Sequence, residues 1–127
     1  PDVWTFNTLI NILTKNDDVP GAELVLEGML KKGIAPNLKT FARMAVAYRE
    51  SNNSEKIVEL HILVQRFNVP PSLNLFALIA KAMLETTKVD QAPDLIHSMR
   101  TNDSMPPLDL VFDLLNETLK QRQEPKR

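Results

Sequence analysis

The sequence predicts an all-α fold, an α-solenoid of stacked antiparallel helix-turn-helix repeats with a 35-residue period that winds into a right-handed superhelix. One observation is a proline-containing segment that returns at a fixed interval: GIAPNLKTF at 33–41, NVPPSLNLF at 68–76 and DSMPPLDLV at 103–111. The other is the helical spacing of apolar residues between these segments, such as Phe6, Leu9, Ile10 and Leu13. Because one helix pair cannot bury its own apolar faces, neighbouring pairs are expected to stack.

Several columns of residues keep the 35-residue interval along the chain. They are Phe6, Phe41 and Phe76; Pro36, Pro71 and Pro106; Val3, Leu38, Leu73 and Leu108; Leu9, Met44, Ile79 and Leu114; Val25, Leu60 and Leu95; Met29, Val64 and Met99; and Ala22, Ile57 and Ala92. The chain therefore divides into repeats 3–37, 38–72 and 73–107, followed by a capping helix at 108–122 and a polar tail at 123–127.

Each repeat is predicted to contain two helices, at 5–15 and 20–32, 40–51 and 54–67, and 74–86 and 89–101. Polar turns at 16–18, 52–54 and 86–88 offer capping side chains to the second helix of each pair. Pro93 lies inside a predicted helix, so this helix either starts later or has a distorted first turn. Gly33, Asn68 and Asp103 share a column and are expected to end helices in the left-handed conformation.

Composition excludes several classes of protein. The chain has 127 residues, 43% of them hydrophobic, no cysteine and a net charge of −1. Disulfides, thiolate metal sites and a cysteine nucleophile are therefore excluded. No apolar run is long enough to predict a membrane-spanning helix, and we expect no membrane partner. Since the sequence starts at Pro1 without a methionine or a leader, we expect a segment of a longer protein, with any targeting signal upstream.

No pattern of catalytic residues is present in the sequence. His61 and His97 fall on different second helices without a neighbouring ligand set, and there is no glycine-rich phosphate loop or nucleophile with a paired base. We therefore predict no catalytic residue, no metal site, no cofactor and no small-molecule substrate. The sequence favours a binding protein over an enzyme.

The first unit, VWTFNTLINILTKNDDVPGAELVLEGMLKKGIAPN, resembles a pentatricopeptide repeat, whose general form is V-x-T-Y-N-x-L-I at the start and M-x-x-x-G-x-x-P-[DN] at the end. The matching residues are Thr5, Phe6, Asn7, Leu9, Ile10, Ala22, Met29, Gly33, Pro36 and Asn37. The second and third units keep the length and the Phe and Pro columns but depart from the pattern elsewhere.

The resemblance implies single-stranded RNA binding, because members of this family typically bind it in mitochondria or plastids at about one base per repeat. It implies that Asn7 and Asn37 read one base, a pyrimidine, by hydrogen bonds, and that Trp4 and Lys39 stack against that base. The alternatives are a capping or turn role for one asparagine, and packing of Trp4 against an upstream repeat.

The later units lack the reading residues that the resemblance requires. The corresponding positions hold Ala42 and Ser72, then Ala77 and Pro107, and finally Phe112 in the last helix. Lys15, Arg49 and Lys81 on first helices are candidate phosphate contacts, with a purely solvated role as the alternative. Only 38–72, with five basic and three acidic residues, has a positive balance.

Two functions from different classes follow. The first is an RNA-binding helical-repeat segment of a gene-expression factor in mitochondria, or alternatively in plastids. The second is a scaffold in which degenerate repeats hold a protein partner, for example within a mitochondrial ribosome. A third reading places this segment at the degenerate end of a longer array, whose upstream repeats supply specificity.

Overall fold

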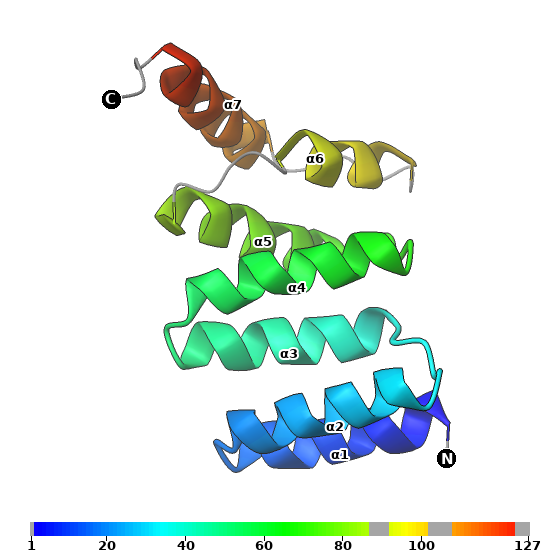
Figure 1. Cartoon of the computed structure of the whole chain (residues 1–127). Helices are drawn as coiled ribbons and strands as arrows, with labels where there is room; N and C mark the ends of the chain where they lie inside the picture. Colours follow the sequence, from blue (N-terminus) through cyan, green and yellow to red (C-terminus); the bar gives the residue numbers. More distant parts are fainter. Residues whose placement is uncertain (1, 87–91, 102–107, 124–127) are drawn as a thin grey trace.

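The structure, a computed structural model, describes residues 2–86, 92–101 and 108–123, and every regular element in these residues is an α-helix. The helices are α1 (Val3–Lys15), α2 (Val19–Lys31), α3 (Leu38–Glu50), α4 (Ser54–Arg66), α5 (Leu73–Thr86), α6 (Ala92–Thr101) and α7 (Leu108–Gln123). They rise in chain order as a column, from α1 and α2 at one end to α7 at the other (Figure 1). The predicted all-α solenoid is confirmed.

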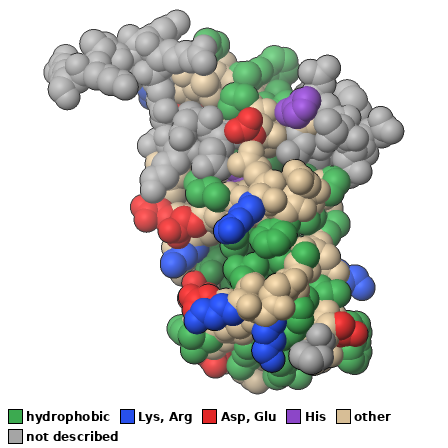
Figure 2. All heavy atoms as spheres, turned by 45° about the vertical axis from the view of Figure 1, so that its right-hand side comes forward, with side chains coloured by type: hydrophobic (Ala, Val, Ile, Leu, Met, Phe, Trp, Pro, Cys, Tyr) green, Lys and Arg blue, Asp and Glu red, His purple; other side chains and the backbone are tan. Residues whose placement is uncertain are grey.

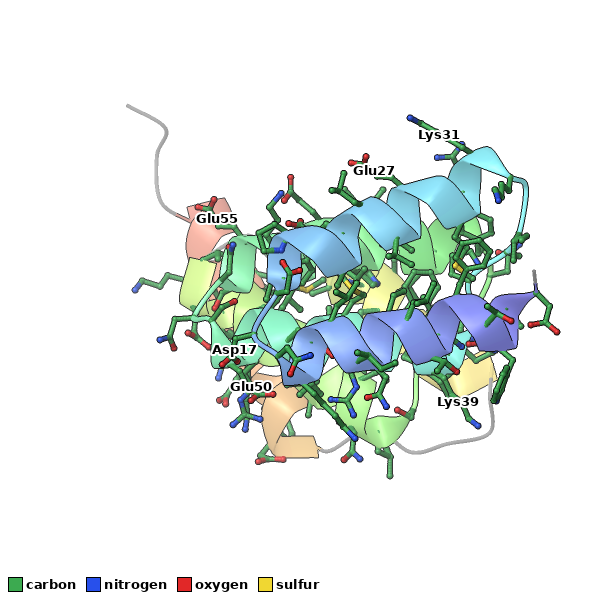
Figure 3. All side chains as sticks on the ribbon, turned by 90° about the horizontal axis from the view of Figure 1, so that it is seen from below. Asp17, Glu27, Lys31, Lys39, Glu50 and Glu55 are labelled. Atoms are coloured by element: carbon green, nitrogen blue, oxygen red, sulfur yellow. The ribbon has the colours of Figure 1, made fainter. Side chains whose placement is uncertain are left out.

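The first helices of the repeats form one continuous layer. Helix α1 contacts α3, α3 contacts α5, and α5 contacts α7. Each of α2, α4 and α6 contacts the first helix of its own pair, and α4 also packs strongly against α5 of the next pair. Seen from the end of the column, α1 and α2 lie side by side, with α2 along one edge of the stack (Figure 3). The layer of first helices therefore provides a shared surface.

The starts of the helices follow the 35-residue period and, for α1 and α3, their N-cap residues. Helices α1, α3, α5 and α7 start at Val3, Leu38, Leu73 and Leu108, 35 residues apart and up to two residues earlier than predicted. Asp2 and Asn37 are the N-caps of α1 and α3, and each accepts the N–H three residues on. Helix α6 is described from Ala92, and residues 89–91, on which the two alternatives for Pro93 depend, lie outside the described residues.

Left-handed residues end the first four helices. Gly33 and Asn68 have φ of 74° and 54°, as predicted, while Asp103 lies outside the described residues. Asp17 and Asn52, in the turns inside the repeats, have the same geometry, with φ of 58° at both. In each case the next residue donates its N–H to a carbonyl of the last turn, as in the bond from Ile34 to Met29 at 3.0 Å.

The core follows the columns read from the sequence. Phe6, Phe41 and Phe76 are buried, and so are the members of another column, Ala22, Ile57 and Ala92. The exposed fraction differs within one column, because Leu9 is 44% exposed whereas Met44, Ile79 and Leu114 are fully buried. The three buried members lie on α3, α5 and α7, each of which packs on an earlier pair, whereas α1 opens the described stack.

A polar contact joins three helices on the α2 side. The Tyr48 hydroxyl of α3 donates to Glu23 Oε2 of α2 at 2.8 Å, and Lys56 Nζ of α4 lies 3.6 Å from the same oxygen. Burial and the adjacent Glu23 carboxylate raise the pKa of Tyr48 above its ordinary value. The contact therefore favours the neutral phenol and fixes the first pair against the second.

None of the described helices combines the length and the apolar character that a membrane-spanning helix requires.

Candidate nucleic-acid interface

A hollow of about 430 Å³ lies between α1 and α3 on the layer of first helices. Its lining comes from the faces of these two helices: Trp4, Asn7, Thr8 and Asn11 on α1, and Lys39, Ala42, Arg43 and Val46 on α3. Three of the predicted site residues, Trp4, Asn7 and Lys39, line this one hollow. We call it the first hollow.

The two predicted reading residues touch each other. Asn7 Nδ2 on α1 donates to Asn37 Oδ1 at 3.0 Å, although the residues are 30 positions apart. Asn37 is also the N-cap of α3, because its Oδ1 accepts the Thr40 backbone N–H at 3.2 Å. The capping role that the sequence offered as an alternative is therefore real, and it coexists with the pairing to Asn7.

Thr40 completes this cluster, and sequence reasoning did not single it out. Its hydroxyl accepts the Asn37 backbone N–H at 3.1 Å and lies 2.5 Å from Asn7 Oδ1. The side chain is buried, and its hydrogen bonds offset the cost of burying a hydroxyl. A signal was present in the sequence, since threonine follows the caps Asp2 and Asn37 at the same distance.

The walls of the first hollow carry an aromatic ring and two cations. Trp4 is 72% exposed, so the described residues leave most of its indole uncovered. Lys39 lies on the α1 side of the stack, away from Glu27 and Lys31 on the α2 edge (Figure 3). Arg43 is one turn after Lys39 and also lines the hollow, but sequence reasoning missed it. Their spacing of four residues, which places both on one face of a helix, could have revealed it.

Two of the three candidate phosphate contacts meet in a second hollow. Arg49 on α3 and Lys81 on α5 line a space of about 190 Å³, together with Asn52, Ser54, Ile57, Leu78, Ala82 and Glu85. Glu85 Oε2 accepts a hydrogen bond from Ser54 Oγ at 3.2 Å. The carboxylate reduces the positive potential there, so the second hollow is less favourable to an anion than the two cations alone suggest.

Lys15 is separated from the first hollow. It is the last residue of α1, eleven positions after Trp4, which corresponds to about 16 Å along the helix. Near this end of the stack Asp17 and Glu50 line a further hollow of about 240 Å³. Figure 3 shows these two acidic residues close together, at the end opposite Lys39. This end of the face therefore carries both signs of charge, since Lys15 and Arg49 lie close to these acidic residues in the sequence.

We call the contact between the first helices of successive repeats a joint, so that α1 with α3 forms the first joint and α3 with α5 the second. The second joint lacks the cluster of two amides and a hydroxyl. The positions of Asn7, Asn37 and Thr40 are taken there by Ala42, Ser72 and Leu75. Ser72 Oγ accepts the Leu75 N–H at 3.2 Å, so the cap remains while the amides are gone. Further along the chain, Phe112 on α7 occupies the column of Asn7 and is 61% exposed, and Pro107, in the column of Asn37, lies outside the described residues.

Charge is mixed over the visible surface. Figure 2 shows basic side chains interspersed with acidic and neutral ones rather than gathered into one patch. His61 is buried on α4 and His97 is exposed on α6. Among the residues that the structure describes, no group of three or more His, Cys, Asp or Glu side chains is arranged to hold a metal ion.

The family model and the curated relatives that match this sequence belong to one family. Residues 1–45 match the model of the PPR repeat family. The mouse protein named pentatricopeptide repeat-containing protein 1, mitochondrial, is 30% identical over 102 residues, which cover 80% of this chain and 14% of the relative. The chain thus spans only a small part of the curated relatives that it matches.

Comparison with solved structures supports the same fold. The pentatricopeptide repeat protein PPR10 from maize superposes with a TM-score of 0.67 at 18% identity, over 98% of this chain and 20% of that one. The PPR domain of Arabidopsis thaliana protein-only RNase P 1, solved in complex with tRNA, gives 0.64 at 15% identity, over 95% of this chain and 64% of that one. The 35-residue period, the match of residues 1–45 to the repeat-family model and the 30% identity to the mouse relative show that the chain belongs to the pentatricopeptide repeat family.

Proposed function

We propose that this chain binds single-stranded RNA on the layer of first helices, by contacts alone and without catalysing a reaction. The observation that carries the proposal is the pairing of Asn7 with Asn37 beside the first hollow, whose walls include Trp4 and Lys39. Amides supply donors and an acceptor for a base edge, and an exposed indole supplies a flat surface for the base. Stacking of this kind contributes roughly 1–3 kcal/mol per base.

In this proposal one base occupies the first hollow. Its edge meets Asn7 and Asn37, and Trp4 and Lys39 lie against its two faces. The base is a pyrimidine, as the family resemblance implies. Because Ala42 replaces the reading asparagine at the next joint, the later repeats contact RNA through its backbone rather than its bases.

The proposed backbone contacts come from a small set of cations. Arg43 serves the first hollow, and Arg49 and Lys81 serve the second. Lys15 contributes at the far end of α1. With so few contacts and a net charge of −1, binding should be modest and should weaken steeply with salt.

We place this function in an organelle, in mitochondria in the first instance. The support is the name of the mouse relative, which is described as mitochondrial. The RNA partner is supported by the structural neighbour solved with tRNA. Both statements concern those proteins, and their transfer to this chain is part of the proposal.

A protein-interaction scaffold is the second candidate function. Helix α7 exposes Phe112, Leu115 and Leu119, spaced so that they share one face of the helix. Exposed apolar rows of this kind are typical of surfaces that bind another protein. If the chain is a scaffold, the later joints lack base-reading residues because they bind a protein instead of RNA.

Titration of labelled short RNAs at low and raised salt tests the two candidates. The double variant Asn7→Ala/Asn37→Ala should lose about tenfold or more in affinity, since it removes the base-edge hydrogen bonds. Ser72→Ala is the matched control, because it removes the equivalent cap at a joint without reading residues. Equal affinity of wild type and double variant would remove base reading, and no binding at low salt would favour the scaffold.

A further inference from the structure

We infer that Thr40 is a positioning residue for base recognition, holding the amides of Asn7 and Asn37 with their N–H groups available to a ligand. This inference rests on the proposed function and deepens it. It concerns a side chain that is itself buried and that does not touch the base. Its effect is transmitted through the orientation of two neighbours.

The orientation of the Asn37 amide follows from the cap of α3. A backbone N–H can donate only to an oxygen, and the Thr40 N–H points at the Asn37 side chain at 3.2 Å. The atom nearest to that N–H must therefore be Oδ1. The Asn37 amide nitrogen, with both of its hydrogens, is turned away from the helix end.

The orientation of the Asn7 amide follows from that of Asn37. Because Asn37 presents an oxygen, the Asn7 atom 3.0 Å away must be a donor, which is Nδ2. Asn7 Oδ1 is thereby directed at the Thr40 hydroxyl, 2.5 Å away. If the Asn7 amide were flipped, two oxygens would face each other and the pair would repel.

The Thr40 hydroxyl is suited to hold this arrangement. It accepts the Asn37 backbone N–H at 3.1 Å, which leaves its own proton free to be donated. This proton has two acceptors in reach, Asn7 Oδ1 at 2.5 Å and Asn37 Oδ1 at 3.1 Å. Because Asn7 Oδ1 is nearer, and Asn37 Oδ1 already accepts from the Thr40 N–H and from Asn7, the proton is best donated to Asn7 Oδ1. A methyl group in place of the hydroxyl would leave Asn7 Oδ1 without this donor, and the amide could turn over.

The consequence for a ligand is a surface rich in donors. The hydrogen bonds among the described residues use one N–H of Asn7 and the oxygens of both amides. The second N–H of Asn7 and both N–H groups of Asn37 are left to donate to a base. On their pairing edges uracil and cytosine each present two acceptors, whereas adenine and guanine each present one. A locked, donor-rich pair therefore favours a pyrimidine over a purine, and a freely turning pair does not.

The next joint supports a link between Thr40 and the amides. Its counterpart of Thr40 is Leu75, and both side chains are 0% exposed. Where the hydroxyl is absent, both asparagines are absent too, replaced by Ala42 and Ser72. The cap of α5 survives without the hydroxyl, since Ser72 still accepts the Leu75 N–H. A threonine is thus not needed to cap the helix at this position.

The test compares wild type with Thr40→Val, which removes the hydroxyl at nearly constant shape, and Thr40→Ser, which restores it. The probes are four labelled RNAs of equal length, each carrying a single C, U, A or G among abasic sites. The readout is the ratio of the pyrimidine to the purine affinity. Because the fraction of folded protein cancels in this ratio, a loss of stability alone would not move it.

We expect wild type and Thr40→Ser to prefer the pyrimidine by about tenfold. In Thr40→Val the preference should fall to about twofold or less, with the change carried by the pyrimidine probes. Thr40→Ala serves as a second variant should valine crowd the site, and it should give the same loss.

The outcomes separate the two ideas. Equal preference in wild type, Thr40→Val and Thr40→Ala would overturn the role of Thr40 and leave the proposed function intact. A wild type that binds none of the four probes, nor any longer RNA, would overturn the proposed function and this inference with it.

Discussion

The first and second joints of the stack share a backbone plan but differ in chemistry. Both set the start of a first helix against the previous first helix, at Leu38 and at Leu73. The first joint buries a hydroxyl among two amides, and the second buries Leu75 at the same depth. The comparison shows that the same position is buried in both repeats, while the side chains at each joint determine whether a polar cluster forms there.

The greatest loss should come from Leu75→Thr, which places the buried residue type of the first joint into the second. It removes apolar volume and adds a hydroxyl without amide partners, so the free energy of unfolding should fall by about 2–4 kcal/mol. Thermal unfolding followed by circular dichroism measures this. Leu75→Val, which loses volume without adding a polar group, should cost less; an equal loss in both would show that the missing amides do not matter.

A second pair of variants removes the cap at each joint. Asn37→Ala and Ser72→Ala should each lower the free energy of unfolding by about 1 kcal/mol, because each leaves a helix N–H without its acceptor. Only Asn37→Ala should also weaken RNA binding, by about tenfold. Fluorescence anisotropy with a pyrimidine probe distinguishes them, and a comparable loss of binding in Ser72→Ala would contradict a difference in function.

Neutralising one cation in each hollow gives a smaller effect. Arg43→Gln should reduce the slope of log affinity against log salt by about 0.7, the value for one phosphate contact on a single strand. Arg49→Gln should reduce it less, because Glu85 lines the same hollow and offsets part of the charge. Slopes measured over several salt concentrations test this, and the opposite order would move the main backbone contact to the second hollow.

The smallest expected effect concerns Asp2, which occupies the column of Asn37 and Ser72. Its hydrogen bonds from the backbone and hydroxyl of Thr5 lower the pKa of Asp2 below its ordinary value of 3.8. A lowered pKa means that the cap stabilises the fold at neutral pH, and that this contribution is lost as the pH falls below about 4. Asp2→Asn should remove this part of the acid sensitivity, whereas Asn37→Ser should leave it unchanged, since neither cap residue titrates.

Much of the fold was predictable because each apolar column repeats several times. Phe6, Phe41 and Phe76 report the same buried position independently, so chance substitutions at one site do not hide the pattern. Leu9 shows the limit of that reasoning. Its exposure depends on which helices surround α1, and a column of equivalent residues carries no information about such an end effect.

The site was less predictable from the sequence. The closeness of Asn7 to Asn37 came from the family resemblance, since the residues are 30 positions apart and their meeting depends on how two helix pairs stack. The spacing of Lys39 and Arg43 was readable, but the shared hollow was not, because it also needs α1. Thr40 was missed since a buried threonine resembles a core residue until its partners are placed.

The matching helix ends at Asp17 and Asn52, and at Gly33 and Asn68, bear on how such a chain can change in length. The turns of the first two hairpins share one left-handed geometry, and so do the two described links between repeats. The gain or loss of a whole 35-residue module would therefore rejoin the flanking parts in phase. A single inserted residue within a helix would instead rotate everything after it by about 100° and expose its apolar stripe. Length variation in this architecture should therefore come in whole modules, and a new binding position can be added without rebuilding the old ones.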